Sequence, residues 1–472
     1  MPSLSIRKDL LRTTVTRLRP RGADYETARR AFLAGDYLCC VESLNVNVSI
    51  AAVALRARSY VRMNRFSEAI DALSSVVLED TPHEYAGELL ALKASALLNL
   101  GDAAMESVLT EARARAFSSG FIPLECEVEF LAALAAWTGG RAADTLCGID
   151  RLLELSETVP SGYASARADY VYSAAFWRSR AHELRGFYEA ARGDYAAQAA
   201  AIARAFKEFD RGHVEDAFFE ARMLSNLAVL VRDVDSDVLA AFVEDRAEQV
   251  AWSGYSAASE FSVYQAIGWN RAKRGDHLGA FRHLRRSASC APTVPLEITA
   301  ILDRSFLARE LGEVLTAGEE LEHAVRLAKR VDWEHTTGLD KAALYSLARQ
   351  LAPSDPVAAR SLWERYRSLK ATVSFLSLAA RGDRRQWADE CSAHAAVLLA
   401  EGQRSRGITL LLESLEIWIE AGYAWRAAAV AADLAALTGE ARYFEIVGRE
   451  AAKQPNSWLA RRFASIKVPV TA

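Results

Sequence analysis

The chain reads as a succession of helical runs that short turns interrupt at nearly regular intervals. Each turn has a glycine or asparagine followed by a polar residue, then an apolar or aromatic residue, and a small residue three positions later. The turns lie at Gly35-Asp36, Asn64-Arg65, Gly101-Asp102, Gly140-Arg141, Gly193-Asp194, Gly275-Asp276, Gly312-Glu313, Gly402-Gln403 and Gly439-Glu440, with two less clear turns near Asp233 and at Ser354-Asp355. Ten steps separate the first turn from the last, so the mean period is about 40 residues, which is typical of helix-pair repeats.

The chemistry of these turns predicts two antiparallel helices in each repeat. Glycine lacks a Cβ atom and can therefore adopt the left-handed conformation that ends a helix. An aspartate in the next position accepts hydrogen bonds from the free N–H groups of the following helix. The chain has 472 residues, more than one compact core usually holds, and only 11 of them are proline. The sequence therefore predicts an all-α solenoid.

One short stretch departs from the helical pattern. Residues 44–50 alternate apolar and polar side chains, which is typical of a strand. No second strand is available to pair with this stretch. We therefore interpret it as an extended linker that ends with Ser49 as the N-cap of a helix starting near Ala51.

The best copies of the repeat resemble the tetratricopeptide repeat. Its signature positions are filled in order by Tyr264, Ile267, Gly268, Gly275-Asp276, Ala280, Leu284 and Pro292. A second good copy has Ala57, Tyr60, Phe66, Ala69 and Leu73, followed by Pro82. A third has Gly186, Gly193-Asp194-Tyr195, Ile202 and Ala205, with Gln198 where a small residue is expected. Small residues such as Gly268 and Ala280 allow the two helices to approach closely, and Leu284 fills the seam between them. The resemblance implies degenerate tetratricopeptide-like helix pairs in a right-handed superhelix, with the first helix of each pair lining a concave groove.

Charge is unevenly distributed along the chain. The 57 basic and 61 acidic residues nearly balance, which gives no global attraction to nucleic acid. Basic residues gather in an N-terminal segment, 1–22, and a C-terminal segment, 453–472, which flank an acidic helical-repeat body, 23–452. We interpret the two ends as solvated tails. The alternative is that they contact the phosphates of a nucleic acid.

No pattern of catalytic residues is found in the sequence. The glycine-rich phosphate loop, the nucleophile elbow and the paired-histidine zinc motif are all absent. The six cysteines form no Cys-x-x-Cys pair, and no apolar stretch is long enough to cross a membrane. We therefore expect a non-enzymatic, cytoplasmic protein that holds no metal or other cofactor.

An alternating acidic run, Glu125, Glu127 and Glu129, could in principle gather a cation. On a helix, however, these carboxylates spread over about 200°. We therefore interpret the run as a solvated helix face.

Ten tryptophans lie mostly within helical segments, and two interpretations of them stay open. They could pack in the core between repeats, or a few could line the concave groove together with arginines, which suits extended peptides or ring-bearing ligands. The tetratricopeptide register places the following residues on the groove face: Arg58, Arg62, Arg180, Glu183, Phe187, Ser262, Gln265, Trp269 and Lys273. We take these as the candidate binding residues.

A second resemblance is carried by the C-terminal part of the chain. Its residues are Ala395, Leu398, Ala400 and Gly402, then the helix 411–419, then 421–428, 437–440 and 455–461. From Trp387 to Arg462 the chain resembles the end of the helical-repeat region of large LuxR-type transcriptional regulators, the group that includes the maltose-operon activators. In such regulators a DNA-binding domain follows the repeat region.

These observations together predict a sensory or interaction module of a bacterial transcriptional regulator. We expect a protein or peptide partner in the groove. A small-molecule effector, self-association and DNA bound through a separate or removed domain beyond residue 472 stay open. The alternative function is a nucleic-acid-associated regulator that uses its basic ends for phosphate contacts.

Overall fold

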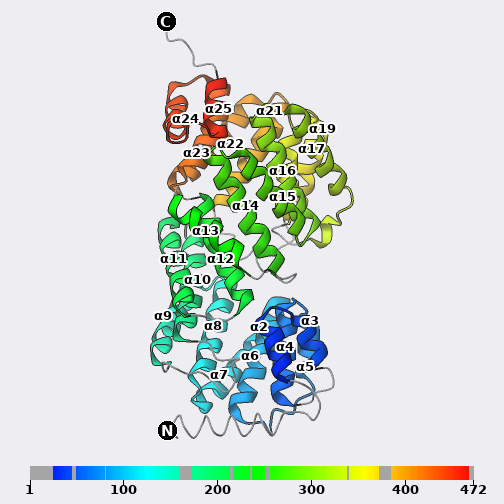
Figure 1. The fold of residues 1–472 in the computed structure, drawn as a ribbon, viewed down its shortest axis with the longest axis vertical. Helices are drawn as coiled ribbons and strands as arrows, with labels where there is room; N and C mark the ends of the chain where they lie inside the picture. The colour runs from blue at the N-terminus through cyan, green and yellow to red at the C-terminus, as the bar shows by residue number, and fades with distance from the viewer. Residues whose placement is uncertain are drawn as a thin grey trace. The chain divides into compact units, whose positions relative to one another are not determined.

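The computed structural model describes residues 25–44, 49–79, 81–159, 173–212, 216–233, 237–250, 252, 256–336, 340–370 and 384–466. In these ranges the regular secondary structure consists of 23 α-helices and one 3₁₀-helix, η2 (Trp333–His335), without any strand (Figure 1). The predicted all-α fold is therefore confirmed. The predicted basic N-terminal segment, 1–22, lies outside the described residues.

The helices alternate between two positions in a repeated helix-turn-helix unit. The first helices are α2 (Tyr25–Leu33), α4 (Ile50–Arg62), α6 (His83–Leu100), α8 (Ile122–Thr138), α10 (Ala174–Ala191), α12 (Ala217–Asp233), α14 (Ala257–Lys273), α16 (Val294–Glu310), α18 (Ala342–Leu351), α21 (Arg384–Ala400) and α23 (Ala424–Thr438). The second helices are α3 (Tyr37–Ser43), α5 (Phe66–Leu73), α7 (Met105–Ser119), α9 (Ala142–Thr158), α11 (Tyr195–Arg211), α13 (Asp237–Gln249), α15 (His277–Cys290), α17 (Val314–Ala328), α19 (Pro356–Lys370), α22 (Arg404–Glu420) and α24 (Ala441–Lys453). A last helix, α25 (Trp458–Ser465), follows α24.

Consecutive helices pack in pairs, and each pair meets the next through its second helix as well as its first, as at α5/α6, α7/α8, α15/α16 and α22/α23. Pairing is seen for α2/α3, α4/α5, α6/α7, α8/α9, α14/α15, α16/α17, α18/α19, α21/α22 and α23/α24. First helices of successive pairs touch at α4/α6, α6/α8, α16/α18 and α18/α21. This arrangement is the predicted α-solenoid of helix pairs. Its right-handed superhelical sense stays a prediction.

The chain divides into two compact units, each with its own apolar core. The first comprises Met1–Tyr188, Ala200–Met223 and Val250–Tyr255, and the second Glu189–Ala199, Leu224–Gln249 and Ser256–Ala472. Alanine is frequent in both cores, which lets helices of a pair approach closely. Among the described helices none is both long enough and apolar enough to span a lipid bilayer.

The turn chemistry predicted from the sequence is present in the structure. Gly275 has a φ angle of 82°, and the carboxylate of Asp276 accepts a 2.9 Å hydrogen bond from the backbone N–H of Gly279 in the first turn of α15. Asn64 takes the same left-handed role with a φ of 58°. The Ser49 hydroxyl accepts a 3.3 Å hydrogen bond from the N–H of Ala52, so the predicted N-cap is confirmed. Residues 45–48 of the predicted linker lie outside the described residues.

Small residues at helix crossings set the distance between paired helices. A Cβ atom added at Gly268 would lie 2.7 Å from Cγ of Leu284, and both Leu284 and Ala280 are fully buried. The close approach of α14 and α15 is therefore confirmed, as is the end of α15 before Pro292.

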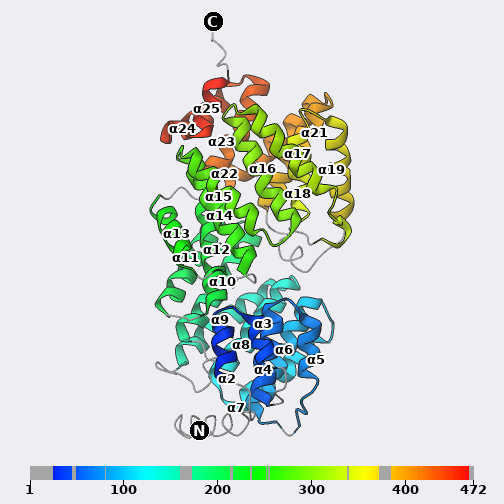
Figure 2. The same cartoon turned by 45° about the vertical axis from the view of Figure 1, so that its right-hand side comes forward.

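The C-terminal basic segment is not the solvated tail that we expected. Its residues 458–465 form α25, which contacts α14, α16, α23 and α24 (Figure 2). Trp458 is fully buried, and Arg462 donates to the carboxylate of Asp433 and lies 3.6 Å from that of Glu310. The apolar side chain of Trp458 and this charge pairing hold α25 on the array. Lys467 lies outside the described residues.

Replacing glycine by alanine should change the free energy of unfolding in opposite directions at Gly268, which lies at a helix crossing, and at Gly318, which does not. Gly268→Ala should lower the free energy of unfolding by about 1–3 kcal/mol, because the new methyl group overlaps Leu284. Gly318→Ala, in an exposed part of α17 with no atom within 4 Å, should raise it by about 0.5–1 kcal/mol through helix propensity. Chemical denaturation measures both. Equal effects in the two variants would show that Gly268 is not at a tight crossing.

Candidate functional site

The predicted groove residues of α4 take part in ion pairs within the first unit. The Arg58 guanidinium lies 3.3 Å from the carboxylate of Glu88 on α6 and 3.2 Å from that of Glu127 on α8. Arg62 lies 3.2 Å from the carboxylate of Asp216 and stacks 4.0 Å from the ring centre of Phe219. Both arginines are therefore neutralised by neighbouring helices.

The predicted residues of α10 form a second cluster in the same unit. Arg180 donates to Glu183 one turn later and stacks 4.4 Å from the ring centre of Phe130. Glu183, which is almost fully buried, also accepts a 2.7 Å hydrogen bond from Arg222. Phe187 packs against Trp137, with ring centres 6.0 Å apart.

The predicted residues of α14 belong to the second unit and also contact the chain itself. Ser262 donates to the carbonyl oxygen of Ala258. Trp269 packs against Phe306 and Trp425, with ring centres 5.9 and 5.7 Å away. Lys273 donates to a backbone carbonyl, and its ammonium lies 4.9 Å from a ring centre of Trp425.

All nine predicted residues are thus engaged in interactions within the chain. A ligand would have to compete with these interactions to bind them, so their binding role stays a prediction. For the tryptophans, the packing interpretation describes Trp269, Trp425 and Trp458 well. The ring of Trp458 lies 5.2 Å from that of Phe306 and 5.4 Å from that of Trp425.

A carboxylate that the sequence did not single out lies beside two of the predicted residues. Asp303 on α16 accepts a 2.7 Å hydrogen bond from Gln265 and a further one from Trp269. Burial raises the pKa of Asp303 to about 6, although these hydrogen bonds and the charges of Arg232 and Arg426 lower it. Only the packing of α16 beside α14 brings these side chains together, so no local pattern could reveal them.

The first unit carries an open channel between the second helices α7 and α9. Both helices pack on α8, but they make little contact with each other. The gap between them has a volume of about 440 Å³. Its floor is formed by three small side chains of α8, Ala132, Ala133 and Ala136, with Gly148 of α9 beside them.

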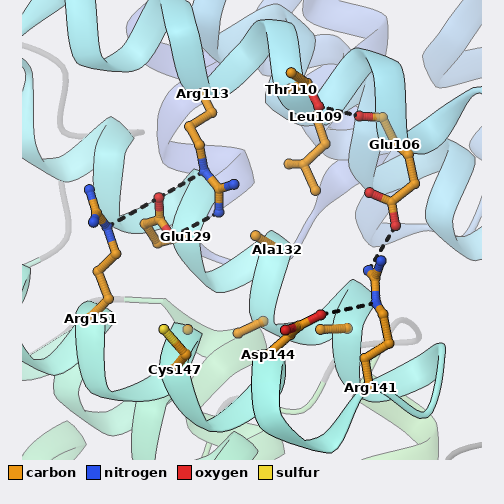
Figure 3. A pocket seen from close by; sticks show the side chains of 13 residues that line it. Glu106, Leu109, Thr110, Arg113, Glu129, Ala132, Arg141, Asp144, Cys147 and Arg151 are labelled. Atoms are coloured by element: carbon orange, nitrogen blue, oxygen red, sulfur yellow. Dashed lines mark hydrogen bonds and ion pairs between the residues drawn. The ribbon is translucent and has the colours of Figure 1, made fainter.

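Ion pairs mark the two ends of the channel (Figure 3). At one end, Arg141, the N-cap residue of α9, lies 2.8 Å from the Glu106 carboxylate of α7 and 3.7 Å from that of Asp144. At the other end, Arg113 of α7 forms two 2.9 Å hydrogen bonds with Glu129 of α8. Arg151 of α9 approaches the same carboxylate to 3.5 Å.

The acidic run of α8 is therefore not a solvated face. Because its carboxylates spread around the helix, Glu127 points to Arg58 on one side and Glu129 to the channel on the other. The side chain of Glu129 is only 7% exposed, whereas those of Arg113 and Arg151 are 51% and 57% exposed. Two accessible guanidinium groups thus share one buried carboxylate. Such groups can bind a carboxylate or phosphate of a ligand.

Cys147 lies in the wall of the channel. It is a free cysteine with an exposed side chain, whereas Cys40, Cys126 and Cys391 are buried and Cys39 and Cys290 are half-buried. A molecule bound over the alanine floor would cover its thiol. Among the described residues no cluster of acidic, histidine or cysteine side chains could hold a metal ion.

Comparison with solved structures gives distant structural likenesses. The chain is similar to a chain of the crystal structure of the APC/C hetero-tetramer Cut9-Hcn1, with 15% sequence identity, coverage of 97% of this chain and 98% of that chain, and a TM-score of 0.27. No protein-family model matches the chain, and no curated protein matches it. The site must therefore be understood from its own residues.

The raised pKa of Asp303 predicts a specific dependence of stability on pH. The folded state binds this proton more tightly than the unfolded state, whose aspartate titrates near 4. The stability that Asp303 contributes is therefore fully present below about pH 4 and is lost as pH rises to about 6.

We test this with Asp303→Asn, which removes the titration. As the pH is lowered from 7 to 4, the free energy of unfolding of the native protein should rise by roughly 1–3 kcal/mol relative to that of the variant. The full pKa shift of Asp303 corresponds to about 3 kcal/mol, and contact of its carboxylate with solvent weakens part of this effect. Denaturation curves at several pH values measure the difference. A difference that does not change with pH would contradict the assignment.

Proposed function

We propose that this protein is a non-enzymatic helical-repeat interaction module that binds an extended segment of a partner protein in the channel between α7 and α9. The observation that carries the proposal is the open volume of about 440 Å³ over the alanine floor. This size is within the range of natural ligand sites. The charged side chains at its ends are more than two-fifths exposed, except for Glu129.

The predicted groove residues are a less suitable binding site than the channel, because they already have partners within the chain. Their charges are already paired or their rings already packed within the chain. Breaking a buried ion pair to admit a ligand costs several kcal/mol, because it leaves an unpaired charge in a dry environment. Binding in the channel breaks no fully buried ion pair, because at least one partner of each ion pair at its ends is about half exposed.

The finer part of the proposal is that the module is the sensory part of a bacterial transcriptional regulator. The resemblance of residues 387–462 to LuxR-type regulators supports it. In this role, occupation of the channel by a protein, peptide or small effector would report the signal. The alternative of phosphate contacts by the basic ends gains no support from Arg462, whose guanidinium lies against Asp433 and Glu310.

A selection experiment tests the site. Short peptides displayed on phage are selected on the native protein and on the protein whose Cys147 carries a bulky maleimide. A third sample carries a methylthio group on Cys147, which modifies the same atom without filling the channel. We expect peptides that bind the native and methylthio proteins and lose at least about tenfold in affinity on the maleimide adduct, equal to about 1.4 kcal/mol.

Two outcomes would contradict the proposed site. If selected peptides bind all three proteins equally, or if none is enriched, the channel is not a binding site. Peptide mapping of the adducts confirms that Cys147, and not Cys39 or Cys290, carries the label.

A further inference from the structure

The channel between α7 and α9 has opposite charges at its two ends. One end holds Glu106 and Asp144 with Arg141, a net charge of −1. The other holds Arg113 and Arg151 with Glu129, a net charge of +1. The acidic residues belong to the first turns of α7 and α9, where the helix dipole favours negative charge.

The spacing of these charges is the same on both walls. Glu106 and Arg113 are seven residues apart on α7, and Asp144 and Arg151 are seven residues apart on α9. Seven residues correspond to about two helical turns, or roughly 10 Å. Each wall therefore presents an acid and a base to the channel on the same helix face.

The charged groups keep hydrogen-bonding capacity for a ligand. Arg113 uses Nε and Nη2 for Glu129, and Arg151 approaches Glu129 only through Nε. The remaining guanidinium N–H groups can donate to a carboxylate. At the other end, the carboxylates of Glu106 and Asp144 are more than half exposed and can accept from an ammonium or guanidinium group.

An apolar pocket of about 330 Å³ adjoins the positive end. Phe117, Val128 and Leu155 line it, together with Ala114, Ala116 and the carboxylate-bearing Glu125. Phe117 is 75% exposed, which is unusual for a large apolar side chain. On α7 it lies four residues beyond Arg113, or about 6 Å along the helix axis.

We infer that the channel binds an extended peptide segment with a basic residue, an acidic residue three positions away and an aromatic or large apolar residue two positions beyond the acid. Three residues of extended chain span about 10 Å, and two span about 7 Å. The basic side chain would then lie on the solvent side of Glu106 and Asp144, which also hold Arg141. The acidic one would accept from the guanidinium N–H groups of Arg113 and Arg151 that do not face Glu129, and the ring would pack against Phe117. This inference rests on the proposed function.

Two peptides of equal composition test the charge pattern. The first has lysine, glutamate three positions later and phenylalanine two positions after that, with serine elsewhere and both ends blocked. The second has lysine and glutamate exchanged. When the second peptide aligns its charges with the channel, its ring falls at the acidic end instead of in the apolar pocket. Alkylation of Cys147, followed by mass spectrometry, gives the affinity of each peptide from its protection of this thiol.

The first peptide should protect Cys147 at a concentration at least about tenfold lower than the second. Arg151→Gln should weaken the first peptide at least about fivefold, and it leaves Glu129 paired with Arg113. Phe117→Ala should also weaken binding of the first peptide at least about fivefold, and it should not lower the stability of the protein, because this ring is exposed. Arg326→Gln, the same substitution at an exposed arginine of α17, serves as the matched control and should change nothing.

Equal protection by both peptides, or protection by neither, would overturn the inference. If peptides selected from the display library still depend on Cys147 in that case, the channel remains a binding site with a different sequence preference. If no selected peptide depends on Cys147, the proposed function itself is wrong. The two failures are therefore distinguishable.

Discussion

The contact between Gly148 of α9 and Ala133 of α8 determines the shape of the first unit around its channel. A Cβ atom at Gly148 would lie 2.7 Å from the Cβ of Ala133, so only glycine allows this helix separation. Because α9 lies so close to α8, and the facing side chains of α8 are alanines, little fills the space between α9 and α7. The same constraint recurs in the second unit, where Gly407 of α22 meets Leu399 of α21. The close packing of the two helices within a pair thus determines how much open space remains between neighbouring pairs.

Charge on the first helices has a structural role in this architecture. Arg58 lies between two carboxylates from different helices, Glu88 and Glu127, and all three side chains are at most 15% exposed. A buried ion pair adds little net stability, but loss of one partner is costly. Such groups therefore favour one pairing of neighbouring helices over others. In the channel, by contrast, the charged groups of α7 and α9 remain accessible to solvent and to a ligand.

The local features of the fold could be predicted because they depend on neighbouring residues. The turn at Gly275-Asp276 and the cap at Ser49 follow from the preferences of single residues, and Gly268 was predicted correctly as a crossing. The channel could not be predicted, since its volume depends on the distance between two helices that are not adjacent in the chain. Asp303 and Trp425 were missed as partners of Trp269 for the same reason. The interpretation of the acidic run of α8 as a solvated face was wrong. Neighbouring helices supply arginines that pair with Glu127 and Glu129, and the sequence of α8 alone does not show them.

Substitution of two adjacent alanines in α8 tests the account most directly. Both alanines line the channel, but Ala132 is only half-buried, whereas Ala133 is buried against Gly148. The account predicts that Ala132→Trp folds with nearly unchanged stability and slows the alkylation of Cys147, because the indole fills the open volume. Ala133→Trp should lose about 1–3 kcal/mol or more of stability through overpacking. Equal destabilisation by both substitutions, or unchanged alkylation of Cys147 in Ala132→Trp, would contradict the presence of an open channel.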